Sequence, residues 1–142
     1  MNWQLLKTEV DNYPLLTSEA LADQLNTANI EAVQNIQVAD IKQYLVVTGK
    51  ILAIKASLEP AALLTVEALD SFDKFVMIEP SNVAALNNQM DGLIAVNSEP
   101  KLFTIDDKNY ILSLGVTVIS RANQLGLGVV TPGDIEYVRG LA

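Results

Sequence analysis

The chain has 142 residues, of which 50% are hydrophobic and 18% are charged. A chain of this length typically forms one compact domain that buries about two-thirds of its unfolded surface, so we predict a single helical domain over residues 1–142. Seventeen acidic and nine basic side chains, with no histidine, give a formal charge of -8. Because a field of this sign repels phosphates and anionic lipids, we expect neither nucleic acid nor a membrane as partner.

Two residue types that carry much of enzyme chemistry are missing, since the chain has no cysteine and no histidine. Disulfides, thiol nucleophiles, thiolate or imidazole metal ligands, and Ser-His or Cys-His pairs are therefore excluded. We predict a protein that is not an enzyme, with no catalytic residue, cofactor, metal or small-molecule substrate. The N-terminal residues lack the basic start and apolar run of a signal peptide, so we expect it in the cytoplasm when synthesised.

Two short helices are predicted near the N-terminus. Residues 3–12 repeat apolar side chains at helical spacing until Tyr13-Pro14, because the residue before a proline is pushed out of the helical region. Thr17 or Ser18 then caps a second helix, which ends at Asn26-Thr27.

Residues 39–56 form the most ambiguous segment. Their apolar positions follow a helical period on one face and partly fill the other, which predicts a central helix buried on most sides. Gly49 inside this helix indicates a close helix crossing. The stretch from Tyr44 to Ile54 is also rich in β-branched residues and is compatible with a buried strand.

Three Glu-Pro dipeptides begin at Glu59, Glu79 and Glu99, 20 residues apart. Proline at the first position of a helix, next to an acidic residue, is a common way to start a helix. We therefore predict helices over 60–73 and 80–96. The residues that follow the three dipeptides are not alike, so the spacing does not indicate a structural repeat.

Two capping boxes are predicted in the C-terminal third. Thr104 with Asp107 opens a helix that reaches Leu125 and ends at Gly126. Alternating apolar residues over 112–118 would also suit a strand, with Gly115 as the point of doubt. Thr131-Pro132-Gly133-Asp134 then begins a short last helix.

Together these signals predict an all-α fold, a compact bundle of six or seven helices with no sheet. One shared core is expected, and Leu52→Ala should cost about 2–5 kcal/mol if that side chain is inside it. The expected core residues are Leu45, Ile51, Leu52, Leu86, Leu114 and Val118.

Three patterns that could suggest chemistry are explained better by structure. Asp70 and Asp73 share a helix face but resemble a solvated helix end, and the pair Asp106-Asp107 suits the first turn of a helix. The sequence over 126–128 is Gly-Leu-Gly, but it follows a helix and lacks the third glycine of a dinucleotide-binding loop.

Three residues are candidates for an interface with a partner. Arg121 and Arg139 are the only arginines, and arginine is favoured in buried or interfacial ion pairs. The alternative is that both stabilise the negative ends of their own helices. Trp3 is the only tryptophan; it could anchor a partner or fold onto the chain's own core.

Both ends of the chain resemble a family of small, mostly uncharacterised helical proteins encoded by tailed bacteriophages. The C-terminal likeness lies in Ile119–Gly128 (ISRANQLGLG), Val130–Ile135 and Arg139-Gly140, and the N-terminal likeness in Leu6–Glu9 and Asp23–Thr27. The two ends make up about a third of the chain. The resemblance implies a phage setting and supplies no catalytic residue.

We therefore expect a non-enzymatic structural protein of a phage virion, at the capsid, neck or tail, that is made in the host cytoplasm. Its partners would be other virion proteins or copies of itself in a homo-oligomer. The alternative is an early phage protein that binds and inhibits a host factor. In the first case, residues 131–142 would dock onto the domain and leave Arg139 available to a neighbouring chain.

Overall fold

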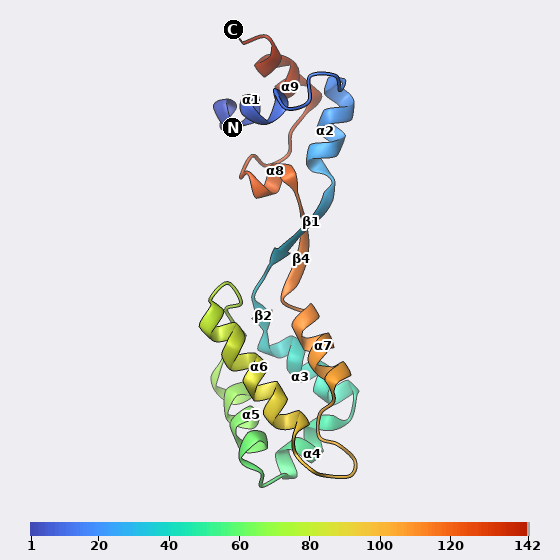
Figure 1. Cartoon of the computed structure of the whole chain (residues 1–142), viewed down its shortest axis with the longest axis vertical. Coiled ribbons are helices and arrows are strands. Elements are labelled where there is room, and N and C mark those ends of the chain that lie inside the picture. Colours follow the sequence, from blue (N-terminus) through green and yellow to red (C-terminus); the bar gives the residue numbers. More distant parts are fainter. Residues whose placement is uncertain (142) are drawn as a thin grey trace. The chain divides into compact units, whose positions relative to one another are not determined.

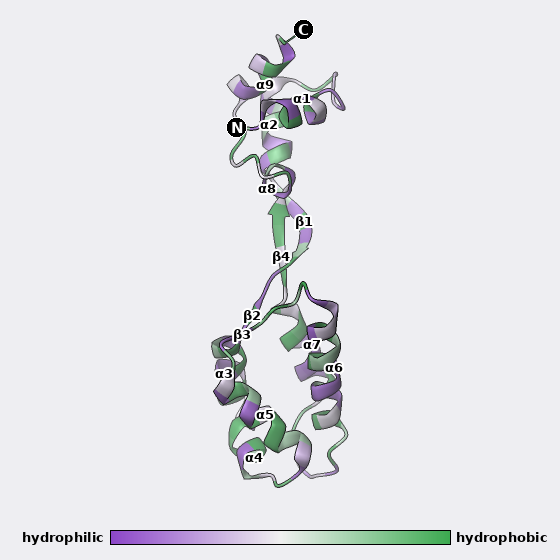
Figure 2. Cartoon of the chain, turned by 90° about the vertical axis from the view of Figure 1, so that its left-hand side faces the viewer, coloured by the Kyte–Doolittle hydropathy of each residue, from purple (hydrophilic) through white to green (hydrophobic). Residues whose placement is uncertain are grey.

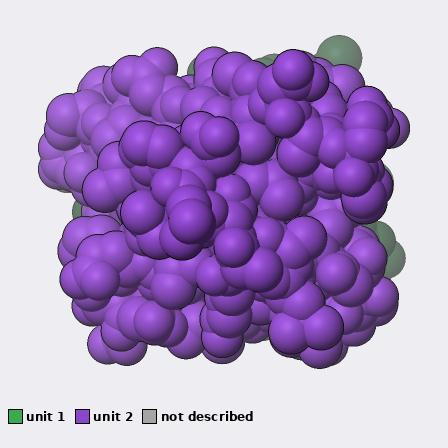
Figure 3. All heavy atoms as spheres, turned by 90° about the horizontal axis from the view of Figure 1, so that it is seen from below, with its two compact units in different colours: residues 1–32, 118–142 green, residues 33–117 purple. Residues whose placement is uncertain are grey.

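The computed structural model describes residues 1–141 and divides into two compact units (Figure 1). Unit 1 combines residues 1–32 with the residues from Val118 onward, and unit 2 is the continuous stretch 33–117. Figure 3 distinguishes the two units by colour. Each unit has its own hydrophobic cluster.

Unit 1 is built from four short helices that come from both ends of the chain. They are α1 (Trp3–Val10), α2 (Ser18–Asn26), α8 (Arg121–Gln124) and α9 (Pro132–Arg139). The caps predicted at Thr17 and Thr131 are present, the latter as a full capping box with Asp134. Ile135 and Val138 of α9 are buried against α1 and α2, because a helix this short needs tertiary contacts to persist.

The loop between α8 and α9 is held by its backbone. Gly126, at a φ of +70°, ends α8, and the amides of Gly126 and Leu127 donate to the carbonyls of Asn123 and Ala122, as in a Schellman motif. The Asn26 side chain then bonds the backbone of Val130 twice, with donor–acceptor distances of 2.6 and 2.9 Å. This loop is thereby fastened to the end of α2.

Unit 2 is mostly helical, with one small sheet. Its elements are β2 (Ile36–Gln37), α3 (Val38–Val47), α4 (Lys50–Ala56), α5 (Pro60–Ser71), β3 (Lys74–Phe75), α6 (Pro80–Ile94) and α7 (Ile105–Ser113). β2 pairs with β3 in antiparallel register, Ile36 opposite Phe75 and Gln37 opposite Lys74. Pro60 and Pro80 start α5 and α6 as predicted, whereas Pro100 lies in the loop before α7.

A second sheet joins β1 (Ala28–Val33) to β4 (Val116–Ser120); β4 is mostly green, and so apolar, in Figure 2. The all-α prediction is therefore wrong. The chain is 58% helical with 11% strand in two small antiparallel sheets, an α+β fold, and nine helices replace the expected six or seven in the part described. None of these helices has both the length and the apolar character needed to cross a membrane.

The helix predicted from Thr104 to Leu125 is interrupted by a strand. It divides into α7, β4 and α8, because the run Val116–Ile119 is β-branched at every position and loses side-chain freedom in a helix. Gly115 also packs closely, since a Cβ there would lie 3.3 Å from the Ile36 side chain.

The segment 39–56 is helical as predicted, and the alternative of a strand is not observed. It is two helices, however, because Gly49 adopts the left-handed conformation with a φ of +74° between α3 and α4. The predicted close crossing at Gly49 is wrong, since nothing lies within 4 Å of a Cβ built there.

The predicted common core is correct only in part. Leu45 and Leu86 are buried in unit 2, and Ile51 and Leu114 pack partly buried against the same cluster. Leu52 is 75% exposed and Val118 is 50% exposed, so their predicted burial is wrong. The break at Gly49 changes which face α4 turns inward, and β4 replaces the helix that would have buried Val118.

We predict that Leu45→Ala and Leu52→Ala differ sharply in stability. Truncation of the buried Leu45 should cost about 2–5 kcal/mol. The same change at exposed Leu52 should stay within about 0.5 kcal/mol. Urea unfolding followed by far-ultraviolet circular dichroism measures both, and equal losses would contradict the placement of α4.

Candidate functional site

Arg121, a candidate interface residue, is engaged within its own unit. Its Nε donates to Glu9 Oε1 at 2.9 Å and its Nη2 to Glu9 Oε2 at 3.1 Å, a two-bond contact. Glu9 is only 6% exposed, and its bond to the guanidinium raises the pKa of Arg121. This pair joins α1 to α8, and both carboxylate oxygens of Glu9 accept hydrogen bonds from the guanidinium.

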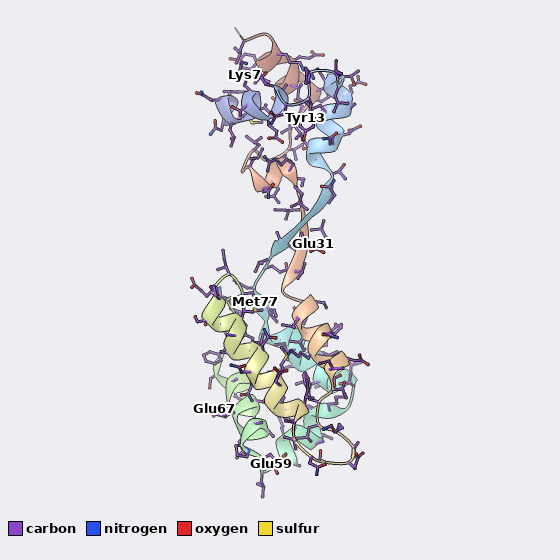
Figure 4. The ribbon with its side chains drawn as sticks, in the orientation of Figure 1. Lys7, Tyr13, Glu31, Glu59, Glu67 and Met77 are labelled. Atoms are coloured by element: carbon purple, nitrogen blue, oxygen red, sulfur yellow. The ribbon has the colours of Figure 1, made fainter. Side chains whose placement is uncertain are left out.

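The other two candidates also have partners within unit 1. Arg139 donates through Nη2 to the carbonyls of Tyr13 and Leu16, at 3.1 and 2.6 Å, so it fastens the loop before α2. The expected free guanidinium at this position is therefore not observed. Trp3 packs edge-to-face on Tyr137 with ring centroids 4.8 Å apart, and it remains 39% exposed. Tyr13, whose carbonyl accepts one of the bonds from Arg139, is labelled in Figure 4.

Asp107 is the hub of a buried polar cluster in unit 2. Its carboxylate accepts hydrogen bonds from Tyr44 Oη at 2.5 Å, from Lys50 Nζ, and from the Thr104 amide at 2.8 Å and hydroxyl at 2.9 Å. The predicted capping box thus has a second role, because the same carboxylate ties the start of α7 to α3 and α4. The Tyr44 ring also stacks on Tyr110, with centroids 4.2 Å apart.

The electrostatics of this cluster favour one fixed protonation state. Burial alone would raise the pKa of Asp107, but the hydrogen bonds from Lys50, Tyr44 and Thr104 outweigh it and hold the pKa below its usual value. The bond to Asp107, together with burial, raises the pKa of Tyr44 to about 12. Since the side chains of Tyr44 and Lys50 both bond to Asp107, the cluster is suited to holding α3, α4 and α7 together.

Unit 2 also has an open groove on the side of α5 and α6, with a volume of about 560 Å³. Its lining residues are Leu64, Glu67, Ala68, Ser71, Phe72, Lys74, Phe75, Val76, Asn82, Ala85, Leu86 and Gln89. The volume lies within the range of binding sites in proteins. Glu67, a lining residue on α5, is labelled in Figure 4.

The walls of the groove are set by a close contact between α5 and α6. Gln89 Nε2 donates to the Ala61 carbonyl at 2.6 Å and to Thr65 Oγ1 at 2.8 Å. Gly92, one turn further along α6, faces the Ala61 methyl, and a Cβ built at this glycine would lie in ordinary contact with it at 3.4 Å. These contacts fix the distance between the two helices.

The groove is apolar with a few polar groups at its edge. Leu64 is 60% and Phe72 is 56% exposed, whereas Leu86 beneath them is buried. Most of the polar side chains already have bonds: Asn82 donates to the Val76 carbonyl and Ser71 to Glu67. The arrangement can bind an apolar surface.

Sequence patterns gave little indication of this groove. Apolar residues at helical spacing predict which face of a helix is buried. In the helix predicted over 60–73, Leu64 and Phe72 share that apolar spacing. Their exposure depends on how α6 lies against α5, which no local pattern encodes. Within residues 1–141, no cluster of three acidic side chains could hold a metal ion.

We predict that Arg121→Gln destabilises unit 1 more than Arg139→Gln does. Loss of Arg121 leaves a buried carboxylate without a partner, whereas the carbonyls that Arg139 binds can turn to water. Trp3 lies in unit 1, so its fluorescence in urea reports the change. A double variant with Glu9→Gln should recover stability relative to Arg121→Gln; an equal loss in the two arginine variants would contradict the role of the pair.

We predict that Asp107→Ala destabilises unit 2 by about 2–4 kcal/mol, because the capping box at Thr104 and the partly buried donors of Tyr44 and Lys50 lose their acceptor. Asp106→Ala, at the exposed neighbouring position, should cost less than about 1 kcal/mol. Circular dichroism in urea measures both.

The same cluster predicts a pH dependence. Since the pKa of Asp107 is lowered by folding, its contribution is present above about pH 4 and is lost as pH falls below it. Since the pKa of Tyr44 is raised to about 12, stability is also lost as pH rises from about 10 to about 12. Tyr44→Phe should reduce the alkaline loss, and an unchanged alkaline profile would contradict this.

Comparison with known proteins adds no assignment to this geometry. No protein-family model matches the chain, and neither a curated protein nor a solved structure is significantly similar to it. The site is therefore interpreted from its own residues.

Proposed function

We propose that this chain is a non-enzymatic structural protein of a tailed-phage virion that acts by packing against other proteins. The observation that carries the proposal is the apolar groove of unit 2, where Leu64 and Phe72 are more than half exposed above a buried floor. Exposed apolar side chains gathered at a hollow are typical of protein-binding surfaces.

Further apolar side chains on unit 2 support a role in packing. Between residues 46 and 78, eight large apolar side chains are more than half exposed: Val46, Val47, Leu52, Leu58, Leu63, Leu64, Phe72 and Ile78. They occur on α3, α4 and α5 and in the loops around α5 and β3, and α4 and α5 both have green, apolar stretches in Figure 2. Water contact with this much leucine and valine is unfavourable, which favours a partner that covers part of it.

The phage setting comes from the resemblance of the two ends of the chain to small phage proteins. In this proposal the protein is made in the host cytoplasm and then enters the particle. An early phage protein that inhibits a host factor is the competing function. The content of the particle separates the two.

Quantitative mass spectrometry of purified phage particles tests the proposal. A structural protein should be present in a fixed ratio to the major capsid protein, in a number of copies that fits the symmetry of the capsid, neck or tail. Absence from the particles, with abundant protein in the infected cell, would overturn it in favour of the early host-directed role.

We predict that Leu64→Ser reduces incorporation into particles more than Leu63→Ser does. The two leucines are neighbours on α5 and have similar exposure, 60% and 52%, but only Leu64 lines the groove. Both changes should alter the free energy of unfolding by less than about 1 kcal/mol. Equal incorporation of the two folded variants would contradict the use of this groove.

A further inference from the structure

We propose that the groove of unit 2 binds a basic amphipathic helix from a different protein. This inference rests on the proposed function and specifies the partner of the same groove. It follows from the shape of the groove, from the charges near it, and from the partners that the chain's own basic side chains already have.

The shape of the groove suits one short helix. The lining residues extend from Leu64 to Ser71 on α5 and from Asn82 to Gln89 on α6, which is about two turns, or about 10 Å, on each helix. An amphipathic helix placed in such a groove contributes apolar side chains at positions i, i+3 or i+4, and i+7. The buried floor at Leu86 would receive them.

The charges at the border of the groove favour a cationic partner. Among the charged residues of 67–79, Glu67 and Lys74 line the groove, and Asp70, Asp73 and Glu79 are exposed within three residues of the lining. Among these acids only Asp70 has an ion pair in the described residues, a 4.0 Å contact with Lys42 in which both side chains are about half exposed. Lysines or arginines flanking the apolar face of a bound helix would offset this field within the Debye length of about 10 Å.

A second copy of the chain does not provide such a helix. Six of its nine basic side chains are held by groups of the chain itself: Lys7, Lys50, Lys101, Lys108, Arg121 and Arg139. Lys74 belongs to the groove and Lys42 is in the ion pair with Asp70, which leaves Lys55, and each copy carries a net charge of -8. Copies therefore repel one another, so the charges favour a different, basic protein.

Synthetic peptides test the inference directly. Three fluorescent helical peptides of about 15 residues carry leucine or phenylalanine at i, i+3, i+4 and i+7 with lysine and arginine on the flanks. Three matched peptides keep the same apolar residues and replace the basic ones with glutamate. Fluorescence anisotropy with the full chain should give binding of the basic peptides at least about tenfold tighter than that of the acidic ones, and the difference should shrink with added salt.

Matched variants locate the binding. Ala85→Arg fills the groove and adds a positive charge, whereas Ala84→Arg changes the neighbouring exposed residue outside the lining; only the first should abolish binding. Glu67→Gln, at the groove, should weaken the basic peptides about two- to fivefold, and Glu59→Gln, at the start of the same helix, should leave them unchanged. Both glutamates are labelled in Figure 4.

Three results would overturn the inference. They are equal or tighter binding of the acidic peptides, no binding of any basic peptide at millimolar concentration, and a dimer of the unmodified chain that Ala85→Arg dissociates. None of these results changes whether the protein is found in purified phage particles. Failure of this inference and failure of the proposed function are therefore distinguishable.

Discussion

The contact between α5 and α6 is the constraint on which the proposed binding groove depends. Gln89 reaches across to the Ala61 carbonyl and to Thr65, and Gly92 faces the Ala61 methyl at close range. Because both partners of Gln89 are on α5, the amide fixes the separation of the helices at this level. The apolar walls formed by Leu64 and Ala85 then remain open to a partner.

Each unit also relies on a carboxylate that is taken out of water. In unit 2, Asp107 caps α7 and binds Tyr44 and Lys50 from α3 and α4. In unit 1, Glu9 binds Arg121 across more than a hundred residues of sequence. A buried carboxylate without a donor is costly, so these bonds specify which helices meet, while the hydrophobic clusters supply most of the stabilisation.

The two arginines that the sequence indicates as interface candidates have a role within unit 1 instead. Arg121 and Arg139 have the chemistry of interface residues, yet each is used to fasten the N-terminal part of unit 1. The exposed apolar groove lies on unit 2 instead.

The sequence by itself determined the local features of this protein. Caps at Thr17, Thr104 and Thr131, prolines that begin α5, α6 and α9, and the glycine that ends α8 all appear as predicted, because each depends on backbone groups only a few residues away. The missing histidine and cysteine likewise needed no structure to exclude disulfides, thiolate or imidazole metal ligands, and Ser-His or Cys-His pairs.

Only the tertiary structure decided which faces are buried and where strands replace helix. The β-branched run 116–119 satisfies two periodicities, and its pairing with β1, more than eighty residues away, selects the strand. Leu52 and Leu64 look like core residues by spacing, yet the turn at Gly49 and the packing of α6 on α5 leave both in solvent. Burial is a property of neighbours in space, so a stripe of apolar residues predicts a helix face but not whether another helix covers it.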